Sequence, residues 1–160
     1  MPLLLPHEPL YLLAEISAVF LGFAIVASSV SRDGFDRVRL VAIVLCASWI
    51  MIGVFTPIWL QRAGVAELLS IRISAGVFLF ANSLGWVLQH LALTKFGSAL
   101  KEWRTTIPLY IFEAIVWIGL VFSIFFNSNL IGPIYLLCLL SVFAQSVVLV
   151  ITMVLNPDKN

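Results

Sequence analysis

The sequence predicts an all-α integral membrane protein, a bundle of five transmembrane helices joined by short loops. Five long apolar stretches carry this prediction, at about residues 9–30, 38–60, 71–93, 107–127 and 131–155. Each holds roughly the 20 residues that a helix needs to cross a hydrocarbon core about 30 Å thick. Because 62% of the residues are hydrophobic and only 11% are charged, too few polar groups remain to shield these stretches from water. We expect a single transmembrane domain that includes the whole chain.

The first two stretches begin and end at residues typical of helix boundaries. The first starts at Pro9, a residue favoured in the first turn of a helix. No Lys or Arg precedes it, and it is longer than the apolar region of a signal peptide, so we expect a span that stays in the mature protein. The second follows Arg39 and contains Pro57 near its end, where we expect a kink in the last turn.

The remaining three stretches have similar limits. The third lies between Arg72 and Lys95. The fourth begins at Pro108, and the fifth starts near Pro133 and stops before Pro157, which cannot continue a helix. Every connection between stretches is short, so successive helices are expected to be antiparallel neighbours.

The charges between the stretches predict the orientation. Seven Lys and Arg residues fall on one side, at positions 32, 37, 39, 95, 101, 104 and 159. The other side has two, Arg62 and Arg72. Because cytoplasmic loops carry the excess of positive charge, we expect the N-terminus outside and the C-terminus in the cytoplasm. Tyr11, Trp59 and Tyr135 would then lie at the outer interface, where aromatic residues gather.

Two charged residues near the outer side form a candidate polar pair or gate. Glu15 lies in the first stretch and Arg72 in the third, at similar expected depth. A charge inside a bilayer is costly, so each should face protein or water, and pairing lowers the cost. The pair is either a gate for an ion or substrate or a structural contact that joins the two helices.

A second set of polar residues falls in the inner half of the membrane. Its members are Glu113, His90, Gln145, Gln89 and Asn82. If their helix faces converge, they form a polar pocket able to pass protons or bind a cation. The alternative is that they only hydrogen-bond helices together.

Small residues mark two candidate helix-packing faces. Ala14, Ala18 and Gly22 recur at every fourth position of the first stretch. Ala81 and Gly85 have the same spacing in the third. Such spacing lets another helix backbone approach closely, so these faces are candidates for contact with a neighbour.

The sequence gives no sign of catalysis, of a metal or cofactor site, or of nucleic-acid binding. No catalytic motif, phosphate-binding loop or cluster of metal ligands occurs, so we expect no catalytic residues, no metal and no cofactor. Cys46 and Cys138 lie inside apolar stretches and are expected to be buried thiols. With a net charge of only +1, no nucleic-acid partner is expected. Membrane lipids are expected as partners.

The first half of the chain resembles a group of small bacterial multi-pass membrane proteins without an assigned activity. The resemblance covers about residues 14–76. It is carried by Ala14-Glu15, Gly22-Phe23, Asp36-Arg37-Val38-Arg39-Leu40, Thr56-Pro57 and Arg72. It implies a bacterial cytoplasmic-membrane protein and again points to Glu15, Arg37, Arg39 and Arg72.

Three functions are left open by the sequence. The first is a small homo-oligomeric channel or transporter for ions or small solutes, since five helices leave little room for a pore within one subunit. The alternative is a membrane-embedded interaction or sensor subunit that acts through helix–helix contacts with a membrane partner protein. An enzyme acting on lipid or quinone ranks last, because no nucleophile or metal set is present.

Overall fold

The structure of the chain is a computed structural model. It describes residues 5–30, 34–95, 99–126 and 129–155. Within these ranges, the side chains of residues 5–26, 40–88, 91, 111–126 and 129–151 are described.

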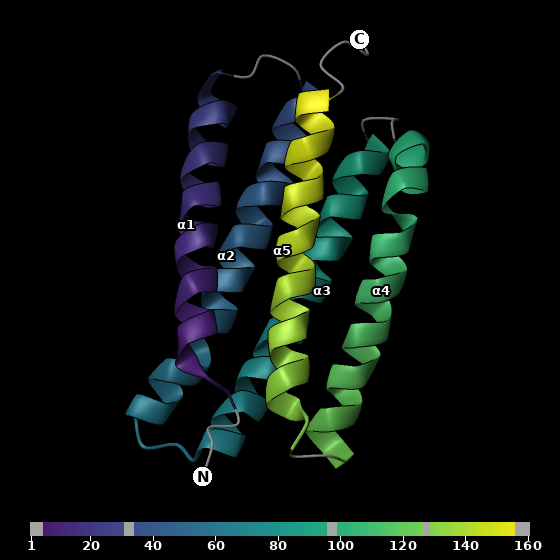
Figure 1. The fold of residues 1–160 in the computed structure, drawn as a ribbon. Helices are drawn as coiled ribbons and strands as arrows, with labels where there is room; N and C mark the ends of the chain where they lie inside the picture. The colour runs from purple at the N-terminus through teal and green to yellow at the C-terminus, as the bar shows by residue number, and fades with distance from the viewer. Residues whose placement is uncertain (1–4, 31–33, 96–98, 127–128, 156–160) are drawn as a thin grey trace.

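The described residues form five helices and no strands, which confirms the all-α prediction. They are α1 (His7–Val30), α2 (Gly34–Arg62), α3 (Glu67–Lys95), α4 (Ala99–Phe126) and α5 (Ile131–Leu155). The helices run alternately up and down, so α1, α3 and α5 point in one direction and α2 and α4 in the other (Figure 1). Four of the predicted stretches coincide with observed helices, apart from a few residues at their ends. The prediction that the fourth begins at Pro108 is wrong, because α4 begins at Ala99 and continues through Pro108. A proline near the start of an apolar stretch is favoured in a first turn, but it does not exclude a helix that begins earlier.

Four of these helices are long and apolar enough to cross a membrane. The described spans are His7–Val26, Leu40–Arg62, Glu67–Leu88 and Ile131–Ile151. In α4, the part with described side chains contributes a shorter apolar segment, Ile111–Phe126. The chain is thus a helical bundle with the composition of a membrane protein.

Two helices form the centre of the bundle. α2 packs against α1, α3 and α5, and α5 packs against α2 and α4. α1 and α3 lie on different sides of α2 and share no packing contact in the described part of the chain. α1 is therefore an edge helix, held almost entirely by α2 (Figure 1).

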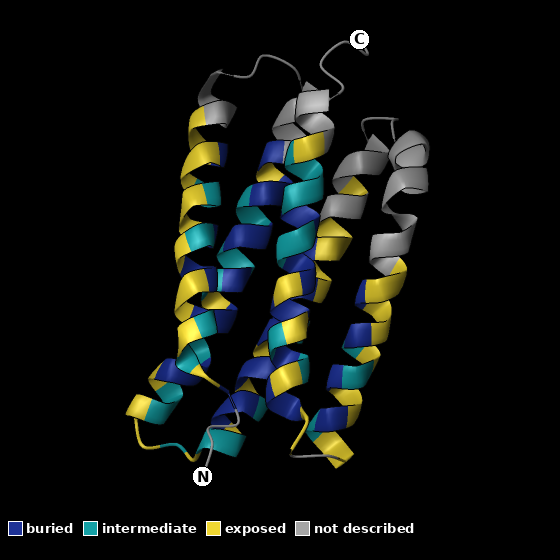
Figure 2. Cartoon of the chain, in the orientation of Figure 1, coloured by how far each residue is buried: buried dark blue, intermediate teal, exposed yellow. Residues whose placement is uncertain are grey.

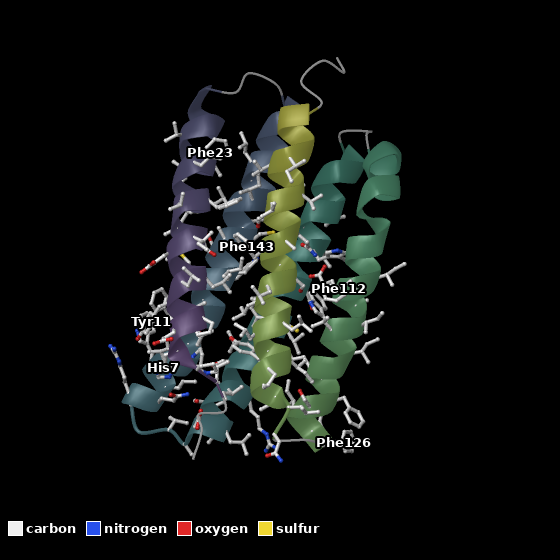
Figure 3. The ribbon with its side chains drawn as sticks, in the orientation of Figure 1. His7, Tyr11, Phe23, Phe112, Phe126 and Phe143 are labelled. Carbon is white, nitrogen blue, oxygen red and sulfur yellow. The ribbon has the colours of Figure 1, made fainter. Side chains whose placement is uncertain are left out.

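The core and the outer surface of the bundle are both apolar. Figure 2 shows buried residues on the inward faces and exposed ones on the outward faces. Ile50, Phe78 and Tyr135 are buried in the main cluster, whereas Phe23 and Phe126 are 52% and 75% exposed (Figure 3). An outward surface of large apolar side chains suits lipid and would be unfavourable in water.

The turn between α2 and α3 explains where α2 ends. Gly64 has φ of 86°, a left-handed conformation that glycine adopts without steric penalty. The Gly64 amide donates to the Gln61 carbonyl at 3.0 Å, and the Val65 amide donates to the Leu60 carbonyl at 3.0 Å. This pair of bonds is the Schellman motif, which satisfies carbonyls at a helix end.

Tyr135 lies in the core and not at the outer interface, so the prediction for this residue is wrong. Its hydroxyl donates to the Gly53 carbonyl of α2 at 2.6 Å. That carbonyl would normally accept from the amide of residue 57, but Pro57 has no N–H, although α2 continues through it. A hydroxyl from α5 therefore replaces the missing donor. Tyr11 and Trp59 are exposed, as expected of interface aromatics.

Candidate functional site

The candidate site is centred on Glu113, the buried acidic residue of α4. Its side chain is 4% exposed. Asn82 of α3 donates from Nδ2 to Glu113 Oε1 at 3.1 Å, and Gln145 of α5 donates from Nε2 to Glu113 Oε2. Three helices far apart in the sequence thus meet at one carboxyl group, and each of its oxygens accepts a hydrogen bond from an amide.

The chemistry of this cluster is set by what surrounds the carboxyl. Among the described residues, no Lys, Arg or His contacts Glu113, and its recorded partners are the two neutral amides. Buried charge in an apolar medium is strongly unfavourable unless it is paired or neutralised. Two amide donors compensate part of that cost but supply no opposite charge. The site is therefore suited to bind a proton or a small cation.

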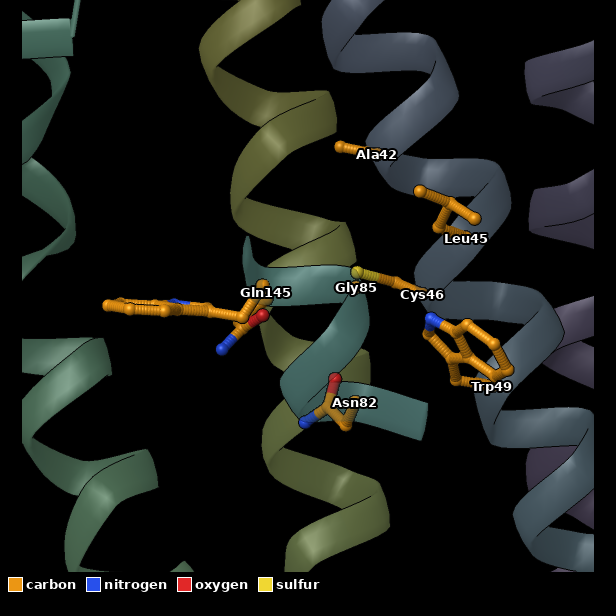
Figure 4. A pocket seen from close by; sticks show the side chains of 8 residues that line it. Ala42, Leu45, Cys46, Trp49, Asn82, Gly85 and Gln145 are labelled. Carbon is orange, nitrogen blue, oxygen red and sulfur yellow. The ribbon is translucent and has the colours of Figure 1, made fainter. Parts of the chain in front are cut away.

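A small pocket adjoins the cluster between α2, α3 and α5. Asn82 and Gln145 lie on one side of it, and Cys46 and Trp49 of α2 on the other (Figure 4). The remaining lining residues are Ala42, Leu45, Gly85 and Trp86. Its free space is close to the volume of a single water molecule, so it is no open channel through the subunit.

Trp49 brings an unused donor to this pocket. Its Nε1 is buried and has no hydrogen-bond partner. A Cβ atom added at Gly85 would lie 2.7 Å from that nitrogen, so the indole packs directly on the glycine backbone of α3. Sequence reasoning did not select Trp49, because nothing in its apolar surroundings along the chain distinguishes it from other core aromatics.

The structure brings together three of the five residues predicted for the inner pocket. Glu113, Asn82 and Gln145 are in contact. Gln89 and His90 belong to α3, but their side chains lie outside the described residues. The helical stripes read from the sequence therefore converge at Glu113, and the predicted contact with His90 stays a prediction.

Glu15 and Arg72 are not brought together in one subunit. Glu15 is exposed on α1, and Arg72 of α3 is partly buried with its Nε lacking a hydrogen-bond partner. The physical reason is that α2 separates the two helices. The expectation of an outer pair within the chain is therefore wrong.

The two small-residue faces differ in burial: the one on α3 is covered within the chain, and the one on α1 is largely exposed. Ala81 and Gly85 are buried, and Gly85 packs on Trp49 of α2, so this face serves packing within the chain and offers no docking surface. On α1, Ala14 is buried but Ala18 and Gly22 are exposed. A Cβ added at Gly22 would meet nothing within 4 Å, so the outer part of this stripe is open.

A polar cluster that the sequence reasoning missed lies at the end of the bundle where α1 begins. His7 Nε2 is 3.1 Å from Gln61 Oε1, and the Leu5 amide donates to Glu67 Oε1 at 3.3 Å. His7 also meets the Tyr11 ring edge-on (Figure 3). These contacts tie the start of α1 to the turn between α2 and α3. Polar residues at both places were the available signal.

Comparisons of the chain with protein families, with curated proteins and with solved structures find no match. In the described part of the chain, no group of three or more His, Cys, Asp or Glu side chains could hold a metal ion.

Proposed function

We propose that the chain is a small channel or transporter of the bacterial cytoplasmic membrane, in which Glu113 binds the transported proton or small cation. The protein would work as a homo-oligomer. α4 would cross the membrane together with the other four helices, with the N-terminus outside and the C-terminus in the cytoplasm. The single observation that supports this proposal is the buried carboxyl of Glu113, held by amides from two other helices and without a cationic partner among the described residues. Ionisable groups inside membrane spans commonly belong to ion or proton pathways.

The two amides allow Glu113 to exist in two states. An ionised carboxylate accepts from Asn82 Nδ2 and Gln145 Nε2, as in the structure. When a proton is bound, the carboxyl becomes a donor, and either amide can rotate about its terminal torsion to present its oxygen as the acceptor. The site can therefore load and release a proton with small side-chain movements.

Access to Glu113 requires a route that the pocket among the described residues does not supply. The adjoining pocket has room for about one water molecule. α4 packs mainly on α5 and only lightly on α3, so the boundary between α3 and α4 is the most open approach to the carboxyl. In the proposal, proton or cation entry occurs along this boundary, next to a neighbouring copy.

Flux into liposomes tests the proposal. Purified protein would be reconstituted with a pH-sensitive dye inside, and a potassium gradient with valinomycin would drive proton entry. We expect flux above protein-free liposomes for the wild type and its loss in Glu113→Gln. Glu8→Gln is the matched control, because it makes the same chemical change at an exposed glutamate in the first turn of α1. The same experiment with sodium or potassium gradients covers the cation alternative. Wild-type flux equal to that of empty liposomes in all of them would reject the proposal.

A fusion experiment tests the orientation. Green fluorescent protein attached to the C-terminus should fluoresce, and alkaline phosphatase at the same place should be inactive, because both report a cytoplasmic location. The opposite pair of results would show the C-terminus outside.

The second candidate function is a membrane-embedded interaction or sensor subunit. It is favoured by the open α1 face that contains Glu15, Ala18 and Gly22. This function predicts no flux in liposomes, together with a membrane complex that Ala18→Leu disrupts. Flux that depends on Glu113 would decide for the transporter.

A further inference from the structure

The exposed face of α1 carries a charge where lipid would otherwise be. Five exposed residues recur at spacings of four and three, namely Tyr11, Glu15, Ala18, Gly22 and Ile25. Glu15 lies in the middle of this stripe, eight residues after the start of α1, or about 12 Å along the helix. Its short side chain does not span that distance to reach the interface. A carboxylate on a lipid-facing surface at this depth is unfavourable. We therefore expect a polar or charged group of another molecule to cover this face.

α3 carries an unmatched cation beside an open face of its own. Arg72 is partly buried, and its Nε has no hydrogen-bond partner. In the described part of the chain, Arg72 makes no hydrogen bond or ion pair. Gly76 follows one turn after Arg72 and Ser83 lies further along the same face, and both are exposed. A Cβ added at Gly76 would meet nothing within 4 Å. Phe80, which is 74% exposed, lies between Gly76 and Ser83 on the same face. α3 therefore offers a positive charge followed by two small residues with one aromatic side chain between them.

The two faces match in direction and depth. α1 and α3 run the same way through the bundle (Figure 1). Their starts are at one level, because the Leu5 amide just before α1 bonds to Glu67, the first residue of α3. From those starts Glu15 lies about 12 Å along α1, and Arg72 lies about 7.5 Å along α3. The difference is within the reach of an arginine side chain.

We infer that α1 of one copy packs in parallel against α3 of the next copy, with the Glu15 carboxylate paired to Arg72 across the contact. Ala18 and Gly22 would then face Gly76, Phe80 and Ser83, so that the small residues of α1 leave room for the Phe80 ring. The occupant of the α1 face is a second copy, because this chain itself supplies the complementary cation at the required depth. The separation of the two helices by α2, which prevents the pair within one subunit, leaves both halves free for neighbours.

This arrangement has a defined symmetry. Different surfaces meet, so the contact is heterologous, and copies that share one membrane orientation close into a ring when the rotation permits. The inferred contact would be the interface of the homo-oligomer in the proposed function. The contact itself does not depend on transport, and only its biological role rests on the proposed function. It is tested by cross-linking, whereas transport is tested by flux in Glu113 variants, so failure of one is distinguishable from failure of the other.

Disulfide cross-linking in membranes tests the contact. A chain with both Ala18→Cys and Gly76→Cys should give a ladder of linked species on oxidation with copper phenanthroline. A mixture of the two single variants should stop at dimers. The wild type is the background control, because Cys46 and Cys138 are buried. Absence of linked species in the double variant, or linking of Ala18→Cys with itself, would overturn the inference, since the latter requires α1 to face α1.

Charge exchange identifies the pair within the contact. Glu15→Arg or Arg72→Glu, each in the double-cysteine chain, should reduce the linked fraction at least tenfold. The combination of both changes should restore it, which also shows that the variants still fold. Glu8→Arg is the matched control, because Glu8 is an exposed glutamate in the first turn of the same helix, and it should leave the ladder intact. Single changes with no effect, or a combination that fails to recover, would refute the Glu15–Arg72 pair.

Discussion

The bond from Tyr135 to α2 supports a quantitative prediction. Tyr135→Phe removes only the hydroxyl, because the edge-on contact of the ring with Phe78, with centroids 6.0 Å apart, is kept. The Gly53 carbonyl then loses its donor at 2.6 Å. It cannot recover the helical bond, because Pro57 has no N–H. An unsatisfied buried carbonyl costs about 1–3 kcal/mol, and measured hydrogen bonds between membrane helices reach about 1.7 kcal/mol. We expect a loss of about 1–2 kcal/mol in the free energy of unfolding.

The proposed cause is tested by a double-mutant cycle with Pro57→Ala. Alanine at this position supplies an N–H that can donate to the Gly53 carbonyl in the ordinary helical pattern. In that background, Tyr135→Phe should cost less than about 0.5 kcal/mol, because the carbonyl keeps a donor. The coupling between the two changes should therefore be about 1 kcal/mol, well above the roughly 0.3–0.5 kcal/mol scatter of independent sites.

Reversible unfolding in mixed micelles, with increasing SDS and helix content read by circular dichroism, measures all four proteins of the cycle. If Tyr135→Phe costs the same with and without Pro57, the hydroxyl does not stand in for the missing amide. The explanation of the buried tyrosine given above would then be refuted.

Three further predictions concern packing and the buried polar cluster. Gly53→Ala should destabilise the protein by about 1–3 kcal/mol, because its Cβ would lie 2.5 Å from a Leu139 methyl. Gly119→Ala should stay near wild type in the same SDS titration, because its Cβ would make only an ordinary contact with Ile134 at 3.9 Å. Equal losses in the two variants would contradict this. Glu113→Leu should lower the free energy of unfolding by about 1–3 kcal/mol, because both amide partners lose their acceptor. Glu113→Gln should lower it less, and thermal unfolding of the two variants measures the difference. The reverse order would exclude the cluster as a stabilising contact. Cys46 and Cys138 should react with maleimide only after SDS unfolding, since both are buried, and rapid labelling of the folded protein would show the core to be open.

Much of the fold was predictable because a bilayer restricts the chain strongly. A backbone in hydrocarbon must satisfy its own hydrogen bonds, so each apolar stretch of span length has to form a helix. Some helix ends were also readable, since Gly64 and the nearby charged residues mark where α2 stops and α3 begins. The start of α4 was not, because Pro108 resembles a first-turn proline but lies inside the helix. Tyr135 was misjudged for a related reason: tyrosine near a span end suits the interface, and only its packing against Gly53 reveals a core role.

The candidate site was predictable in part, and the part that failed depended on helix order in space. Asn82, Glu113 and Gln145 lie at similar depth on their helices, and depth follows from position along the chain. Glu15 and Arg72 also lie at similar depth, yet α2 separates their helices. Periodicity shows that a face is polar but does not name the helix that covers it.

The sequence by itself determined the all-α class, the number of helices and most of their limits, because these depend on the solvent around each segment. Only the tertiary structure decided which faces meet: it joined Glu113 to two amides, buried the Gly85 face against α2, and left Glu15 open on α1. The physical reason is that apolar helices in lipid have no hydrophobic preference for one neighbour over another. Their arrangement follows from shape and a few polar contacts, which become visible when the side chains are placed together.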